Sequence, residues 1–323
     1  MTAVLFSKLL AIFIAAAIGW FVGHMRWLGR ADGDGGDPAR VLSNVAFYLF
    51  VPALLFRTTA RVDFDTLPWV TLAAFFLPVL LVQLGVYAWQ RSRRPAQAAA
   101  PTVRAITASF GNTLQVGVPL AAGVFGEAGL AIHITVVSLH ALTLLSVGTV
   151  LVELDLARQQ QRHAGLAGML ALTLRNTVIH PVVLPVLAGF AWNLAGLGLP
   201  AVLDEVLQLL GSAVVPLCLV LIGMSLAYQG WPRGWASLLG LLGVKLLLLP
   251  ALVLVIAHWG FGLSGLPLAV IVMMGALPAG SNAMMFAQRY RTLEVETTGA
   301  VVLSTLLFAL VAPLWLLLPA WVG

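Results

Sequence analysis

Charged residues are scarce in this chain of 323 residues: 17 are basic, 12 are acidic, and together they make up 9% of the sequence. So little charge cannot cover the surface of a water-soluble globule of this size. Hydrophobic residues make up 61%, and the mean hydropathy is +1.01. They run in blocks of about 20, the length of a membrane-spanning helix, without the period-two alternation of a β-barrel strand. The composition therefore predicts an all-α polytopic membrane protein.

Cysteine is almost absent too. The single Cys218 excludes an intrachain disulfide, and no Cys/His cluster with metal-ligand spacing accompanies it, so we expect no metal site. A nucleotide-binding motif is also missing, so any transport energy would come from a gradient. The net charge of +5 comes from arginines in loops rather than from a basic domain, which argues against a nucleic-acid partner. We expect no cofactor, and coupling to H⁺ or Na⁺ stays open, as does a homodimer.

Ten apolar blocks can be marked between turn signals such as "ADGDGGDP" and "YQGWPRGW". They are 3–23, 41–60, 67–90, 102–123, 129–152, 171–193, 203–227, 235–259, 265–287 and 297–320. No segment between them is long enough for a second domain. We therefore interpret residues 1–323 as a single transmembrane transporter domain.

Arginine is distributed unevenly among the connections between these blocks. The odd-numbered connections hold thirteen arginines, and the even-numbered ones hold only Arg57 and Arg61. Because positively charged loops stay in the cytoplasm, both termini are predicted to lie on the outer side of a bacterial inner membrane. Ten spans then divide into two halves of five, about 1–152 and 171–323, which would enter the membrane from opposite sides as inverted repeats. A Leu-Pro followed by a Trp in both "FLPVLLVQLGVYAW" and "LLPALVLVIAHW" supports the repeat.

Two stretches place polar residues inside apolar blocks: "GNTLQVGVPL" at 111–120 and "GALPAGSNAM" at 275–284. Proline removes a helical hydrogen bond, and the freed groups are tolerated in a membrane only inside protein or beside a wet cavity. We expect Gly117-Val-Pro119 to interrupt span 4 and Pro278-Ala-Gly280 to interrupt span 9. Two ordinary proline kinks are the alternative. Paired breaks in corresponding spans favour a transporter binding site. The predicted substrate-binding residues are Asn112, Gln115, Gly117, Pro119, Pro278, Gly280, Ser281 and Asn282.

The electrostatics of broken helices predict the charge of the ligand. The N-terminus of each second half-helix carries unpaired amides and partial positive charge, which favours a carboxylate or a similar anion. Pro119 suits the first turn of one half-helix, and Ser281 or Asn282 could cap the other. The two C-terminal ends, with their carbonyls, would suit a cation or a lysine ammonium.

The same stretches resemble the auxin efflux carrier family, which includes plant PIN proteins and bacterial malonate and malate carriers. The resemblance is carried by "SFGNTLQVGVPLAAGVFGEAGL", "ALPAGSNAMMFAQRY", "SNVAFYLFVPALLF" and "LGSAVVPLCLVLIGMSLA". It identifies the chain as similar to PIN-like bacterial transporters of the bile acid/sodium symporter-like superfamily. It implies ten spans in two inverted five-helix repeats, with broken spans 4 and 9 crossing beside an organic-anion site.

The family motifs match this sequence at particular residues. Asn112 and Pro119 match the span-4 motif, and Pro278 and Tyr290 match the span-9 motif. PIN proteins have a second proline where this chain has Asn282, so the shape of the second break and the substrate are both expected to differ.

Lys245 lies near the middle of span 8, where a buried charge is a functional hypothesis by default. We expect it near the helix crossing, standing in for a coupling cation or attracting an anion; snorkelling toward an interface is the alternative. Asn44 is a supporting candidate, although interhelical hydrogen bonding explains it equally well. His180 is another supporting candidate. For His180, as for His133 and His140, a hydrogen bond to a neighbouring helix is favoured over proton transfer.

These features favour a secondary active transporter, not an enzyme. The predicted substrate is a small organic anion, a dicarboxylate or an auxin-like acid. It would move by alternating access, as an elevator in which one helix group moves against the other. A membrane-embedded hydrolase using Ser281 lacks a Gly-x-Ser-x-Gly elbow and a histidine–carboxylate pair. A passive channel is disfavoured by the absence of charged rings. The sequence leaves substrate identity, direction and coupling ion open.

Overall fold

The computed structural model describes residues 2–29, 38–61, 67–93, 95–160, 179, 181, 183–229 and 235–322. Within these residues all regular elements are helices, as the composition predicts. Six helices there are long and apolar enough to cross a membrane: Pro38–Ala60, Trp69–Ser92, Leu120–Gln159, Ala201–Met224, Leu238–Gly260 and Glu294–Leu316. The predicted total of ten spans and the inverted repeat are not confirmed and stay predictions.

The N-terminal half contains α1 (Thr2–His24), α2 (Pro38–Val45), the π turn η1 (Ala46–Phe50), α3 (Val51–Ala60), α4 (Trp69–Ser92), α5 (Ala100–Ser109), the π turn η2 (Thr113–Gly117) and α6 (Val118–Gln160). The long α6 is two helices that meet at Gly126, whose φ of 63° and ψ of −162° are not helical. Glycine adopts positive φ at little steric cost, so Gly126 ends one helix and lets the chain turn into the next. This bend lies between the predicted blocks 102–123 and 129–152.

The C-terminal half contains α8 (Val183–Leu194), α9 (Ala201–Ser212), α10 (Val214–Gln229), α11 (Trp235–Gly243), η3 (Val244–Leu248), α12 (Leu249–Val255), η4 (Ile256–Gly260), α13 (Gly265–Ala276), α14 (Ser281–Arg289) and α15 (Glu294–Val322). Of the predicted span 171–193, the structure describes only residues 179, 181 and 183 onward, and His180 lies outside the described residues.

Proline explains three of the π turns. The turns η1, η2 and η3 each end two residues before a proline, namely Pro52, Pro119 and Pro250. Proline has no N–H for the carbonyl four residues earlier, and its ring presses on that carbonyl, so a wider preceding turn relieves the clash. At Pro250 the carbonyl without its helical donor is that of Leu246, and it accepts a hydrogen bond of 2.8 Å from Trp315 Nε1 of α15.

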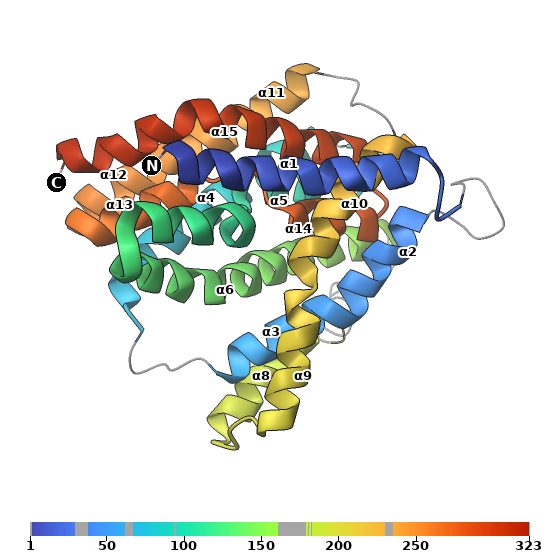
Figure 1. Cartoon of the computed structure of the whole chain (residues 1–323), viewed down its shortest axis with the longest axis horizontal. Coiled ribbons are helices and arrows are strands. Elements are labelled where there is room, and N and C mark those ends of the chain that lie inside the picture. The colour runs from blue at the N-terminus through green and yellow to red at the C-terminus, as the bar shows by residue number, and fades with distance from the viewer. Residues whose placement is uncertain are drawn as a thin grey trace.

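By their mutual contacts the helices pack as two groups. In the first, which we call the peripheral group, α1 packs along α10, and α3 packs against α8 and α9; α2 and η1 belong to it. The second, which we call the crossing group, comprises α4, α5, η2, α6 and the elements from α11 to α15. Figure 1 shows α3, α8 and α9 together at the foot of the view. Packing is more extensive within each group than between them.

Glycines bring α1 and α10 of the peripheral group into close contact. A Cβ on Gly19 would lie 2.0 Å from the Val220 carbonyl oxygen, and one on Gly223 would lie 1.8 Å from the Ala16 carbonyl oxygen. Small residues that let helix backbones approach are a main source of helix association in membranes. The α1–α10 pair is therefore fixed by backbone contact at these positions.

This packing predicts that Gly223→Ala will force α1 and α10 apart and destabilise the protein by about 1–3 kcal/mol, the usual effect of overpacking. We expect a melting temperature several degrees lower in thermal unfolding of the detergent-purified protein. Gly240→Ala in α11 is the control, because a Cβ there meets nothing within 4 Å. Equal melting temperatures for both variants would contradict the close approach.

Candidate functional site

Two interrupted helices meet inside the protein. The helix α5 ends at Ser109 and α13 ends at Ala276, and the segments that follow run antiparallel. The Asn112 amide donates to the Pro278 carbonyl oxygen at 2.8 Å, and the Gly280 amide donates to the Phe110 carbonyl oxygen at 2.9 Å. These bonds form an isolated β-bridge between Gly111 and Ala279. Each break therefore satisfies backbone groups that the other exposes.

Side chains satisfy further backbone groups at the crossing. The Ala279 amide donates to Ser304 Oγ of α15 at 2.9 Å. The Thr113 carbonyl oxygen lies 2.8 Å from His133 Nε2, a hydrogen-bond distance that requires the proton on Nε2. The Gly275 carbonyl oxygen accepts a hydrogen bond from Lys245 Nζ at 2.8 Å. In a membrane interior each such group would cost several kcal/mol if left without a partner. This agrees with the expectation that His133 binds a neighbouring backbone group.

Two glycines are needed for the segments to approach. A Cβ on Gly280 would lie 2.9 Å from the Gly111 oxygen and 2.8 Å from Phe110 Cδ1. A Cβ on Gly117 would lie 2.6 Å from His133 Cε1 and 2.8 Å from Leu277 Cδ1. Real Cβ atoms do not show contacts this short. At Gly280 the obstacle includes the Gly111 backbone, so a larger residue would push the segments apart, whereas at Gly117 it would displace the His133 and Leu277 side chains.

The structure corrects two local predictions. In span 4 the non-helical residues are 110–112, upstream of Gly117-Val-Pro119, because the extended chain there pairs with the other break. Pro119 instead lies in the second position of α6, after the π turn η2. The predicted cap of α14 by Ser281 or Asn282 is also wrong: Gly280 is the N-cap, with no side-chain cap hydrogen bond, because the helix begins at Ser281.

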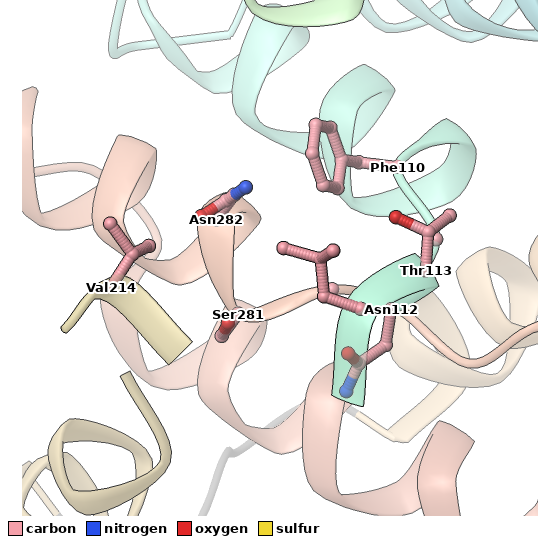
Figure 2. Close-up of a pocket in the computed structure, with 9 residues that line it drawn as sticks. Phe110, Asn112, Thr113, Val214, Ser281 and Asn282 are labelled. Carbon is pink, nitrogen blue, oxygen red and sulfur yellow. The ribbon is translucent and has the colours of Figure 1, made fainter. Parts of the chain in front are cut away.

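A small pocket opens beside the crossing (Figure 2). It is lined by Phe110, Gly111, Asn112, Thr113, Leu114, Val214, Gly280, Ser281 and Asn282. Figure 2 shows Ser281 and Asn282 at the start of α14 on one side and Asn112 and Thr113 on the other. Its volume of about 20 Å³ accommodates about one water molecule, so the pocket is closed to a larger ligand in this conformation.

The predicted site residues fall into three sets. Asn112, Gly280, Ser281 and Asn282 line the pocket, and Pro278 and Gly117 contribute to the crossing through backbone or close contact. For Gln115 and Pro119 the structure describes only the backbone, in η2 and α6.

Of the supporting candidates Lys245, Asn44 and His180, the structure places only Lys245 at the crossing. Lys245 is 1% exposed, so its ammonium does not reach an interface, and it binds the crossing through the Gly275 carbonyl. Asn44 lies on an exposed face of α2 and is not among the residues that line the pocket. His180 lies outside the described residues.

Other residues of the site were not predicted from sequence. Phe110 and Thr113 flank Gly111 and Asn112, and their position next to Asn112 in the sequence could have identified them as pocket residues. Val214 follows the single non-helical residue Ala213 between α9 and α10, so it enters the pocket from the peripheral group. Ser304 sits in an apolar helix without any motif, and nothing in the sequence points to its bond with the Ala279 amide.

Tyr290, which follows α14, donates a hydrogen bond of 3.3 Å to Glu153 Oε1 of α6. Burial, together with the Glu153 carboxylate, raises the pKa of the Tyr290 phenol above its usual range. The phenol therefore stays protonated at neutral pH and remains a donor. This bond ties the end of α14 to α6 within the crossing group.

Residues 4–316 match the family described as membrane transport protein. An "Uncharacterized transporter" of Methanothermobacter thermautotrophicus is 24% identical over 96% of both chains. The "Uncharacterized transporter YfdV" of Escherichia coli is 23% identical over 96% of both chains. A "Putative malonate transporter" of Rhizobium meliloti is 23% identical over 89% of this chain and 88% of its own.

The crossing predicts opposite outcomes for substitution of Gly280 and Gly111. Gly280→Ala should separate the segments and lower the melting temperature by several degrees, because the new methyl group meets backbone atoms. Gly111→Ala is the matched control for stability, since its Cβ would contact its neighbours at 3.5 Å or more, an ordinary van der Waals distance. Thermal unfolding of the two variants measures the effect. Equal tolerance of the two substitutions would contradict the geometry.

Proposed function

Because the chain belongs to the membrane transport protein family, also known as the auxin efflux carriers, we propose that it is a secondary active transporter of a small organic anion. The substrate is a carboxylate that binds at the crossing of the two broken helices and reaches the two sides of the membrane alternately. The observation that carries this proposal is the antiparallel pairing of residues 110–112 with 278–280 beside a polar pocket.

The charge of the ligand follows from the helix ends at the pocket. The helix α14 begins at Ser281 without a side-chain cap, and Ser281 and Asn282 of its first turn line the pocket, so the positive end of its dipole lies beside the pocket. Helix N-termini of this kind bind carboxylates and phosphates. Asn112, Ser281 and Asn282 add polar groups that can hydrogen-bond a carboxylate. The name of the Rhizobium meliloti relative makes dicarboxylates such as malonate the first substrates to test.

Access alternates by movement between the two helix groups. The pocket lies at their boundary, because Val214 of the peripheral group faces residues of the crossing group across it. A dicarboxylate cannot fit in about 20 Å³, so the groups separate to admit it. The transporter resides in a bacterial inner membrane with both termini outside, and an ion or substrate gradient drives the movement.

The site predicts that Asn112→Ala and Asn282→Ala each weaken binding of the transported anion about tenfold or more, since a hydrogen bond to a charged group contributes about 1.5–3 kcal/mol. Thermal shift and proteoliposome uptake, with mono- and dicarboxylates and indole acids at varied pH and Na⁺, would identify the anion and measure the loss. Asn193→Ala is the control, because its amide binds the Thr59 and Ala60 carbonyls in the peripheral group. If both site variants kept full affinity for every ligand found, the site assignment would be wrong.

Two ion pairs, made by the nearby residues Glu294 and Glu296, allow an experimental test of movement between the peripheral and crossing groups. Glu294 binds Arg40 of α2 at 3.0 Å and therefore joins the two groups, whereas Glu296 binds Arg104 of α5 at 2.8 Å inside the crossing group. If the groups slide, the first pair separates in every cycle and the second does not. In a Cys218→Ala background, cysteines at 40 and 294 joined by a reducible bifunctional thiol reagent should stop uptake until the link is reduced.

The matched control places the cysteines at 104 and 296, where the same reagent should leave most uptake intact. Inhibition by both links, or by neither, would exclude sliding between these groups.

A further inference from the structure

An apolar groove opens on the surface of the crossing group, between α4 and the helix that runs through η3 and α12. Residues of α4 between 81 and 89 form one wall, and residues between 244 and 252 form the other. We call this the α4–α12 groove. Its volume is about 420 Å³, and the side chains that line it are apolar. Leu81, Trp89 and Leu248 on its walls are about half exposed, so the groove is open toward the bilayer.

The two helices leave this space open for local reasons. The helix α4 packs against α12 and η4 and less against η3, so the two walls separate at η3. Among the described residues, a Cβ on Gly85 would meet nothing within 4 Å, so the wall of α4 is hollowed at this position. On the other wall the π turn η3 (Val244–Leu248), which precedes Pro250, widens the helix. The groove therefore results from a glycine and a proline in facing helices.

A guanidinium lies at one end of the groove. Arg93 Cζ lies 4.2 Å from the centroid of the Trp89 ring, and Trp89 lines the groove. A guanidinium that stacks by its face keeps the N–H donors at its edge available for an anion. Within the described part of the chain Arg93 forms no ion pair, whereas Arg91 two residues earlier binds Asp155. Arg93 can therefore bind a phosphate without the loss of an internal partner.

The order of these groups matches the order of groups in a phospholipid. Tryptophan and arginine are typical of the membrane surface, and α4 rises about 12 Å from Trp89 to Leu81, into the hydrocarbon. The arginine-rich connection after α4 is predicted to be cytoplasmic, and the cytoplasmic leaflet is the one that carries negative surface charge. A hydrocarbon chain below an acidic headgroup therefore fits both the groove and its end.

Charge favours a lipid over a second copy of the chain. In a membrane dimer with a twofold axis along the bilayer normal, the same end of α4 from both copies would meet at the same depth. Each Arg93 would then face its counterpart, and Arg94 follows it in the sequence. Two like charges repel, whereas a lipid phosphate attracts the guanidinium.

We propose that the α4–α12 groove binds one acyl chain of an anionic phospholipid of the cytoplasmic leaflet, and that Arg93 binds the phosphate of its headgroup. The inference requires that the chain lies in a membrane, but it requires no transported anion. A wild type that transports no anion but binds this lipid would contradict the proposed function and leave the lipid site intact.

The headgroup contact can be tested with palmitoyl-oleoyl phosphatidylglycerol and the matching phosphatidylcholine, added to the detergent-purified protein and measured by native mass spectrometry. We expect the wild type to bind phosphatidylglycerol about fivefold more tightly, the contribution of one arginine at a membrane surface. Arg93→Gln should remove this preference and leave phosphatidylcholine binding unchanged. Arg158→Gln is the matched control, because Arg158 lines a separate pocket beside Asp155. An equal preference in wild type and Arg93→Gln, or the same loss in Arg158→Gln, would overturn the headgroup assignment.

The groove itself can be tested by filling it. Gly85→Leu should reduce binding of both lipids fivefold or more in protein that keeps its melting temperature, because the new side chain enters open space and leucine is favourable in a helix. Gly240→Leu is the control: a Cβ there also meets nothing within 4 Å, but Gly240 does not line the groove. Undiminished binding to Gly85→Leu, or equal losses in both variants, would overturn the groove as the binding site.

A third measurement locates the lipid without a substitution. Phosphatidylglycerol with a photoactivatable diazirine in one acyl chain should label residues 81–89 and 244–252 of the wild type in nanodiscs several times more than Leu306 and Leu310, which are exposed on α15. Labelling spread evenly over these helices would show ordinary contact with bulk lipid and would overturn the proposal.

Discussion

An unsatisfied backbone N–H or C=O inside a membrane protein costs several kcal/mol, and the crossing of two broken helices is built around this constraint. Residues 110–112 and 278–280 lie outside their helices and exchange two backbone hydrogen bonds, which form an isolated β-bridge. Neither break would be tolerated alone at this depth, because each supplies the acceptor or donor that the other lacks. The pairing therefore makes an irregular backbone possible in an otherwise helical, apolar chain.

The remaining features of the core follow from the same requirement. The Ala279 amide, the Thr113 carbonyl and the Gly275 carbonyl are each served by a buried side chain from another helix, namely Ser304, His133 and Lys245. These polar residues are surrounded by a hydrophobic core, and each has a backbone partner at the crossing. Burial of these polar side chains would destabilise the fold if they lacked partners, but here their hydrogen bonds stabilise the two helix breaks.

The crossing also separates two electrostatic environments over a short distance. The first turn of α14 lies beside the pocket, and the Gly275 carbonyl in the last turn of α13 is bound by Lys245. An anion and a cation are therefore favoured on different sides of one bridge. The pocket also lies where the peripheral and crossing groups meet, so a movement between the groups would change its shape. In this conformation the groups are held together by contacts such as the stacking of the Arg289 guanidinium on Tyr48.

The amino-acid sequence alone determined the class of protein, its all-helical structure over the described residues and the two regions where polar residues interrupt apolar blocks. These depend on composition and on the local chemistry of proline and glycine, which act within a few residues. Only the tertiary structure decided that the break in span 4 lies at 110–112, that Lys245 binds the Gly275 carbonyl, that Asn44 faces away and that Ser304 and Val214 take part. The physical reason is that these contacts join residues far apart in the chain, and helix packing selects their hydrogen-bond partners.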